Sequence, residues 1–495
     1  MTSSIADRQR EATDQSRLII GLLVALYWVF FTFVVSDKML GEPDMWWHIR
    51  TGQWIWEHKA VPTTDPFSYT FAGHPWIAKE WLSQLLYYGA YHLAGWNGVL
   101  ALGVIALGLA ALALYMFVSE DLFPSLAAAL VLCGMFLASP SITVRPHLLT
   151  LPIFVLWTHQ LFKASRAGRA PHYLWLLVLV LWANLHAAFT FGFVIAFFAF
   201  LDFLETTRLK DRKGLLAWIG FLVLCPVVTL IHPYTYHAML ATWLVVGPNE
   251  AVPLIDEWKP FDAQTQGVYA VSILGLVFAA LASGFRLGMA RALFLMVVAF
   301  LFLTHVRYSF YLFPILSLIV APDMAAQFTR FATSSWRLQP LDRFDRFIST
   351  RFRPLLAAVT AGFLLTFAWG GAWLKAAPPE QIAATAAFDY VKTHRLTGHV
   401  MNFYNFGGPM VFHDIPTFID GRVEQLFLGN FIKTYAWGPD TEQTMADTLK
   451  QYDVRWTMMP PDDKRTALLD KMPGWKRVYS DANAVIHQRQ DAPAP

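Results

Sequence analysis

Charge is scarce in this chain and unevenly spread along it. Asp, Glu, Lys and Arg make up 15% of its 495 residues, whereas an average globular protein carries about 25%. Residues 376–495 hold 26 charged residues among 120, which is a normal share, and the first 375 residues hold only 47. We therefore expect a polytopic membrane domain over residues 1–375 and a water-soluble domain over 376–495, which excludes a soluble enzyme.

The chain also has few cysteines, little net charge and no glycine-rich phosphate loop. The two cysteines fall inside apolar runs, so they form neither a disulfide framework nor a metal-binding spacing. A net charge of +3 is too small to indicate a nucleic acid or another polyanion as a partner. No glycine loop of the dinucleotide or nucleoside-triphosphate kind occurs, which argues against a nucleotide sugar or ATP as the direct substrate.

Long apolar runs dominate the first 375 residues. Hydrophobic residues make up 56% of the chain, and a membrane span needs about 20 predominantly apolar residues in succession. The runs predict about eleven transmembrane helices, at residues 18–36, 96–118, 124–139, 148–163, 173–183, 187–205, 215–231, 267–283, 289–304, 308–321 and 354–374.

The side of each loop follows from its Lys and Arg content. With a cytoplasmic N-terminus and alternating spans, the inner segments carry 18 Lys and Arg and the outer loops before residue 376 carry 8. Positive residues prefer the cytoplasmic side, so this orientation is favoured. We thus expect a multi-pass protein of the bacterial inner membrane, with a cytoplasmic N-terminus and a periplasmic C-terminal domain.

The first outer loop, residues 37–95, begins with an acidic helix. Pro43 suits the first position of a helix that runs to about His58, and the tryptophans of this helix indicate that it lies along the membrane interface. Asp44 falls in the first turn, with His48 one turn later on the same face. Asp44 could also serve only to complement the positive end of the helix dipole.

A second interfacial helix is predicted after a stretch rich in proline and glycine. It begins at Lys79 and Glu80 and ends before Gly95. The order of these features, with a Trp-Ile pair in the first helix, resembles the GT-C superfamily of membrane glycosyltransferases. These enzymes take sugar from a polyprenyl-phosphate carrier and include protein O-mannosyltransferases, the lipid A aminoarabinose transferase and oligosaccharyltransferases. The resemblance covers about the first 120 residues, and the rest only by span count, side and an outer C-terminal domain.

The resemblance implies which residues carry the chemistry. By it, Asp44 matches the catalytic acidic residue of the superfamily, and Glu42 completes the spacing of the acidic motif. Glu80 matches a second carboxylate of the loop. The aminoarabinose transferases have Glu-Lys where this chain has Lys79-Glu80, so the order of the pair is inverted here.

Transfer of a sugar from a lipid phosphate needs a base and a source of positive charge. A carboxylate takes the proton of the acceptor hydroxyl, and cations stabilise the charge that grows on the departing phosphate. Asp44 and Glu80 are the candidate carboxylates. A divalent cation, Mg²⁺ or Mn²⁺, held by Asp44, Glu80 and His48 is one source of positive charge. The other is a set of outer-side groups that bind the lipid phosphate, for which the candidates are Lys79, Arg145, Arg307, His48 and Tyr308.

Several outer polar residues also have structural explanations. Arg145 could extend its charge to the interface without binding a ligand. Asn184 and His186 lie in a tight outer hairpin and could satisfy exposed backbone groups there. Glu257 belongs to the long outer loop and could form part of a solvated surface. Glu42, His186 and Glu257 are nevertheless candidates for contact with an acceptor.

Residues 376–495 alternate between strand and helix patterns, which predicts a small α/β domain. Asp420-Gly421-Arg422 could recognise an acceptor, although a turn stabilised by an Asp–Arg pair is favoured. We expect helices over 382–394, 441–452 and 464–471, a turn over 405–408, and strands over 399–404, 417–422, 454–459, 475–479 and 484–487.

These observations favour an inverting membrane glycosyltransferase that moves a sugar from a polyprenyl-phosphate carrier to a glycan, lipid or protein acceptor at the periplasmic face. A transporter or flippase for a lipid-linked glycan is an alternative, but such proteins usually show internal repeats and ionisable groups at mid-membrane. The sequence shows no repeat, and its polar candidates gather at one face. A non-catalytic assembly protein of the same fold is the third hypothesis.

Overall fold

The computed structural model describes residues 5–246, 258–332, 347–348, 350–372, 375–428, 431–436 and 438–490. The described chain is mostly helical, with one small sheet near its C-terminal end. Helices occupy all eleven predicted ranges, namely α1 (Ile5–Val34), α4 (Trp81–Asp121), α5 (Pro124–Ala138), α7 (Leu151–Arg166), α8 (Trp175–Leu185), α9 (Phe189–Thr207), α10 (Arg212–Val228), α12 (Gly267–Ser283), α13 (Met289–Thr304), α14 (Ser309–Gln327) and α17 (Phe352–Ala372).

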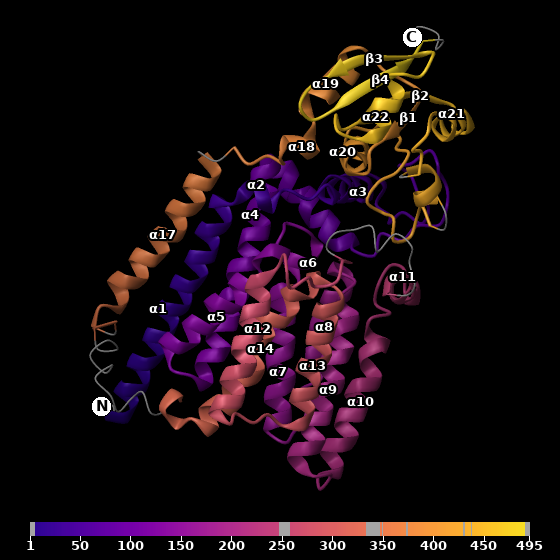
Figure 1. Ribbon diagram of the computed structural model, residues 1–495. Coiled ribbons are helices and arrows are strands. Elements are labelled where there is room, and N and C mark those ends of the chain that lie inside the picture. The colour runs from indigo at the N-terminus through magenta and orange to yellow at the C-terminus, as the bar shows by residue number, and fades with distance from the viewer. Residues whose placement is uncertain are drawn as a thin grey trace.

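Six helical stretches of the described chain are long and apolar enough to cross a membrane, and several shorter helices are apolar as well. The protein is therefore polytopic, while the number of eleven spans stays a prediction. Figure 1 shows these helices running side by side as a bundle, with α17 packed along α1 at one edge. Short helices connect them, namely α2 (Ser36–Met39), α6 (Pro146–Leu149) and α11 (Tyr236–Val246).

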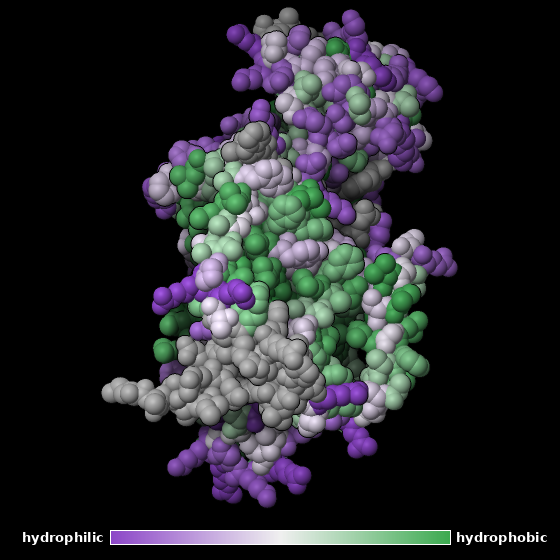
Figure 2. All heavy atoms as spheres, turned by 90° about the vertical axis from the view of Figure 1, so that its left-hand side faces the viewer, coloured by the Kyte–Doolittle hydropathy of each residue, from purple (hydrophilic) through white to green (hydrophobic). Residues whose placement is uncertain are grey.

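Different parts of the chain lie at the two ends of the bundle. The N-terminal end of α1 lies at one end, and the C-terminal region lies over the other, together with α3 (Asp44–His58) (Figure 1). The sequence prediction that these two parts lie on opposite sides is therefore consistent with the fold. On the face that Figure 2 presents, hydrophobic residues gather between two hydrophilic ends. Leu364 and Leu365 of α17 are largely exposed in this protein, as expected for helices that face lipid.

The first outer loop contains both predicted interfacial helices. α3 ends at His58, where Lys59 takes a left-handed conformation with φ 53°. α4 begins at Trp81 and is interrupted at Ala94 and Gly95, whose φ of 57° is readily adopted by glycine. The arm before this break is the predicted second interfacial helix, and the arm after it belongs to the bundle.

The C-terminal region forms a four-stranded sheet in the order β1-β2-β4-β3. β1 (His399–Asn402) pairs in parallel with β2 (Val454–Met459), and the other pairs are antiparallel. β3 (Trp475–Ser480) and β4 (Val485–Arg489) form the predicted hairpin. The helices of this region are α18 (Glu380–Ala383), α19 (Thr385–Thr393), α20 (Gly407–Phe412), α21 (Glu442–Gln451) and α22 (Lys464–Leu469).

Two expectations for this region are wrong. Residues 405–408 form no simple turn, because a 3₁₀ turn over Tyr404–Phe406 leads directly into α20. Residues 417–422 do not join the sheet. Instead Thr417 forms an isolated parallel bridge with Ser68, in which its N–H donates to the Phe67 carbonyl at 3.2 Å. The Thr417 backbone groups thus bond to the first outer loop, while the Asn402 side chain accepts from the Phe418 N–H at 2.9 Å and donates to the Ile419 carbonyl at 2.8 Å.

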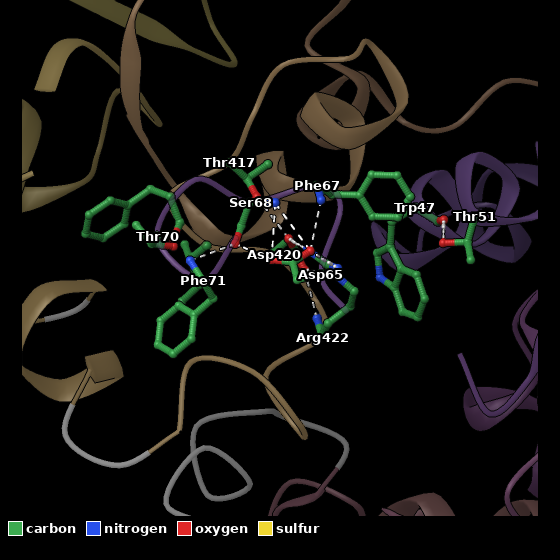
Figure 3. Close-up of polar contacts among 12 residues, drawn as sticks. Trp47, Thr51, Asp65, Phe67, Ser68, Thr70, Phe71, Thr417, Asp420 and Arg422 are labelled. Atoms are coloured by element: carbon green, nitrogen blue, oxygen red, sulfur yellow. Dashed lines mark hydrogen bonds and ion pairs between the residues drawn. The ribbon is translucent and has the colours of Figure 1, made fainter. Parts of the chain in front are cut away.

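A buried ion network joins the first outer loop to the C-terminal region (Figure 3). Arg422 donates to Asp420 through Nε at 2.8 Å and Nη2 at 2.7 Å, and to Asp65 through Nη1 at 2.5 Å. All three side chains are almost completely inaccessible to solvent. The guanidinium also lies over the Trp76 ring, 4.8 Å from its centroid. Because each charge is both paired and hydrogen-bonded, this network can exist without water.

Replacing Arg422 by Ala should destabilise the protein by about 3–5 kcal/mol, since it leaves two buried carboxylates without their cationic partner. Arg455→Ala is the matched control, because Arg455 pairs with the exposed Asp453 at 2.9 Å. Its removal should lower the free energy of unfolding by at most about 1 kcal/mol. Denaturant unfolding of the purified proteins in detergent measures both effects. Equal losses in the two variants would contradict a special role for the buried network.

Candidate functional site

Asp44 meets Arg145 at the end of the bundle that the C-terminal region covers. Asp44 is the first residue of α3, and Arg145 directly precedes α6 in an extended conformation. Arg145 Nη2 donates to Asp44 Oδ2 at 2.8 Å, and its Nη1 lies 3.5 Å from Glu42 Oε2. The indole Nε1 of Trp47 donates to Asp44 Oδ1 at 3.0 Å. Asp44 therefore does more than complement the helix dipole, because both of its oxygens have side-chain donors.

Glu80 forms a second group with two histidines. Its Oε1 lies 3.2 Å from His186 Nε2, and its Oε2 lies 3.7 Å from His48 Nε2. The three side chains come from the start of α4, the turn between α8 and α9, and α3. The Glu80 side chain is only 12% exposed. Burial raises the pKa of Glu80 to about 7, and the positive charge of Lys79 opposes that rise.

The tautomer of His186 follows from its backbone contact. The Ala188 N–H donates to His186 Nδ1 at 3.1 Å, so this nitrogen is an acceptor and the proton resides on Nε2, facing Glu80. His232 uses the same arrangement, since the Tyr234 N–H donates to its Nδ1 and its Nε2–H donates to the Lys79 carbonyl at 3.2 Å. Burial lowers the pKa of His186 well below its usual value, which keeps the imidazole neutral.

The two groups lie close enough to act on one another. The charges of Arg145 and Asp44 both affect the pKa of Glu80, with opposite signs. The charges of Arg145 and Arg307, besides burial, lower the pKa of His186. Asp44 and the two arginines therefore lie within electrostatic range of the Glu80–His186 pair.

The other candidates have specific contacts. Arg307 stacks its guanidinium on Trp258, 4.3 Å from the ring centroid. Lys79 forms an ion pair with Glu424 of the C-terminal region. The Tyr308 ring lies 6.1 Å from that of Tyr311.

The hairpin polar residues divide into two roles. Asn184 accepts from the Trp81 indole and donates to the Ile231 carbonyl at 2.9 Å, so its role is structural, as the backbone-satisfying alternative expects. His186, by contrast, faces Glu80. Glu257 lies outside the described residues.

The predicted metal ligands do not stand together in the described chain. Among the described residues, no group of three His, Cys, Asp or Glu side chains is arranged to hold a metal ion. Asp44 faces Arg145, whereas His48 and Glu80 face each other. These residues as placed do not fit a divalent cation, and no step below is assigned to one.

Sequence reasoning considered Asp420-Gly421-Arg422 for acceptor recognition but missed that this turn contacts Asp44. Gly421 lies against the Asp44 carboxylate, where a methyl group would overlap Oδ1 and stand 2.8 Å from Trp47 Nε1. Asp65 of the first outer loop was not among the sequence candidates, yet it accepts from Arg422. The sequence signal was Gly421 between two residues of opposite charge, Asp420 and Arg422. This pattern predicts a turn but does not indicate that the turn packs against Asp44.

Glu80 should make folding stability fall as pH rises. Below pH 4.5 the carboxyl group is protonated in the folded and the unfolded chain, and between 4.5 and about 7 only the folded protein keeps the proton. Relative to Glu80→Gln, the free energy of unfolding of wild-type protein should therefore fall by roughly 3 kcal/mol between pH 4.5 and about 7 and stay constant at higher pH. Unfolding in detergent at pH 5 and pH 8 measures the difference. Glu57→Gln, at an exposed position of α3, is the control. If wild-type protein lost the same stability relative to Glu57→Gln as relative to Glu80→Gln, the raised pKa of Glu80 would be refuted.

Comparisons with known proteins give a distant structural likeness. No protein-family model and no curated protein matches the sequence. The apo oligosaccharyltransferase of Archaeoglobus fulgidus is similar at 14% identity and a TM-score of 0.46, over 88% of this chain and 69% of that one. AglB of the same archaeon, in complex with an inhibitory peptide and a dolichol-phosphate, is similar at 14% identity and a TM-score of 0.41, over 95% and 75%.

Proposed function

We propose that this protein is an integral-membrane glycosyltransferase that moves a sugar from a polyprenyl-phosphate carrier to an acceptor hydroxyl. The reaction takes place at the periplasmic face of a bacterial inner membrane, with the N-terminus cytoplasmic. Residues 1–375 form the transmembrane domain, and residues 376–495 form a domain that covers the site. The observation that carries the proposal is the Asp44 carboxylate held 2.8 Å from the Arg145 guanidinium at the covered end of the bundle.

The proposed step is a single displacement at the anomeric carbon. The acceptor oxygen forms a bond to C1 of the sugar while the bond from C1 to the phosphate oxygen breaks. The acceptor proton passes to Asp44, and the electron pair of the broken bond stays on the phosphate oxygen. The configuration at C1 is inverted, because the acceptor attacks from the face opposite the leaving phosphate.

Arg145 gives this step a means of coupling donor binding to catalysis. Its planar guanidinium suits phosphate oxygens as well as carboxylates. When the donor phosphate binds Arg145, Asp44 stays in place and shares this cation with the phosphate, so its carboxylate becomes a stronger base. The base is thus activated only when a donor is present.

Arg307 and Lys79 complete the positive side of the proposed phosphate site, with His48 and Tyr308 as further polar contacts. Arg307 is held by stacking on Trp258. Lys79 is held by Glu424, so a phosphate would share or replace that carboxylate. Glu80, whose pKa is raised to about 7, can offer an O–H or a carboxylate oxygen to the acceptor hydroxyl. Glu42 and His186 lie beside these groups and belong to the acceptor side of the proposal.

A lipid-linked glycan transporter is the second candidate, and a non-catalytic protein is the third. A transporter would carry its ionisable groups near mid-membrane. The groups discussed here instead sit on α3, the start of α4, α6 and the α8–α9 turn, at one end of the bundle. A non-catalytic role would use the pair between Asp44 and Arg145 only for stability, so the experiments below separate stability from transfer.

Asp44→Asn should reduce sugar transfer by about 10²- to 10⁴-fold, since an amide cannot take the acceptor proton. The measurement is transfer of radiolabelled sugar from a polyprenyl-phosphate donor by purified protein, with and without a chelator, beside its melting temperature. Asp37→Asn, at an exposed position of α2, should keep full activity. Undiminished transfer by a folded Asp44→Asn protein would exclude Asp44 as the base.

Arg145→Gln should weaken donor use more than acceptor use. Loss of a hydrogen bond to a charged phosphate costs about 1.5–3 kcal/mol, which corresponds to roughly a 10- to 150-fold lower kcat/KM for the donor. Steady-state kinetics with varied donor concentration measure this effect. Arg169→Gln, exposed at the opposite end of the bundle, should change nothing. An unchanged kcat/KM in Arg145→Gln would contradict the phosphate contact.

A further inference from the structure

Three glycines of the C-terminal region make close backbone contacts. A side chain at Gly408 would overlap the Pro43 carbonyl oxygen, directly before Asp44. A side chain at Gly407 would overlap the Ile419 carbonyl oxygen. Gly421 follows on the same segment and lies against the Asp44 carboxylate. The start of α3 is therefore packed between the start of α20 and the turn at Gly421.

Space, and not backbone conformation, requires glycine at position 421. Its φ lies outside the left-handed region, so any residue could adopt its backbone angles. The atoms that a methyl group would meet are Asp44 Oδ1 and Trp47 Nε1. These two atoms form the 3.0 Å hydrogen bond to Oδ1 of Asp44, whereas Arg145 bonds to Oδ2. Gly421 thus lies directly against Oδ1 of the carboxylate whose other oxygen bonds to Arg145.

Gly421 is itself held firmly by its two neighbours. Asp420 and Arg422 bond to each other through two donors, and Arg422 reaches across to Asp65. Thr417 donates to Asp420 Oδ2 at 2.9 Å, so the carboxylate on that side is fixed as well. A turn pinned on both sides cannot carry Gly421 away from Asp44 without breaking buried charge pairs.

We infer that Arg422 is a positioning residue of the reaction centre, which acts through Gly421 to keep the Asp44 carboxylate against Arg145. This inference rests on the proposed function for the role of Asp44. The contact between position 421 and Asp44 does not depend on that role. On this account the turn at 420–422 completes the site from the C-terminal region and needs no contact with the acceptor.

Gly421→Ala tests the inference through catalysis. The methyl group displaces Asp44 from Arg145, so kcat should fall at least 10-fold while KM for the donor changes by less than about 2-fold. The acid limb of the pH–rate profile should move to higher pH, because a carboxylate separated from a guanidinium has a higher pKa. Gly89→Ala is the control, since a methyl group there meets nothing within 4 Å. An unchanged kcat and pH profile in Gly421→Ala would overturn the inference.

Arg422→Lys tests the same inference from the other side. Lysine keeps the charge but cannot form the paired hydrogen bonds to Asp420, so the turn should loosen without leaving the carboxylates unpaired. We expect the acid limb to shift in the same direction as in Gly421→Ala and by a smaller amount. A loss of activity with the pH profile of wild-type protein would assign Arg422 a purely structural role and overturn the inference.

A double-mutant cycle separates the contact from the proposed function. The drop in melting temperature caused by Gly421→Ala should be smaller in an Asp44→Ala background, because the overlapping carboxylate has been removed. Equal drops in both backgrounds would overturn the contact and the inference with it. If wild-type protein transfers no sugar while the two positions are coupled, the proposed function fails and the positioning of Asp44 by the turn stands.

Discussion

The buried ion network of Arg422 with Asp420 and Asp65 is the interaction on which the contact between the helix bundle and the C-terminal region depends. Burying a charge is costly unless partners replace the lost water. Arginine can meet this requirement because its planar group offers five donors, which here reach Asp420 twice and Asp65 once. Asp65 belongs to the first outer loop, whereas Asp420 and Arg422 belong to the C-terminal region, so the bond from the guanidinium to Asp65 links the two parts. The network therefore fixes how the two parts meet.

The same docking brings the candidate chemistry together. The first outer loop places Asp44, at the start of α3, in contact with Arg145 through Oδ2. Gly421 of the C-terminal region lies against Oδ1 of the same carboxylate. The covered Glu80 then takes two imidazole neighbours and a raised pKa. These properties have one cause, which is the removal of polar side chains from water at the end of a helix bundle.

The opposite end of the bundle uses charge differently. Arg291 of α13 bonds to Asp202 of α9 at 2.9 Å and also to Asp323 of α14, which joins three helices. Ser165 of α7 donates to the same Asp202. Each of these groups has a partner from another helix, so the cluster explains packing between helix ends. The described residues thus place ion pairs between helices at this end of the bundle, and the group of Asp44, Glu80, Arg145 and His186 at the other.

The sequence by itself predicted the long apolar helices, the two helices of the first outer loop, and Asp44, Glu80 and Arg145 as the residues of interest. Hydropathy and helix-start signals are local, so a short window contains all that they require. Only the tertiary structure decided that residues 417–422 pair with the first outer loop, that His186 faces Glu80 with its Nε2–H, and that Gly421 lies against Asp44. Each of these depends on a partner far away in the sequence, and the choice among distant partners is made by packing and by the cost of leaving a buried polar group unpaired.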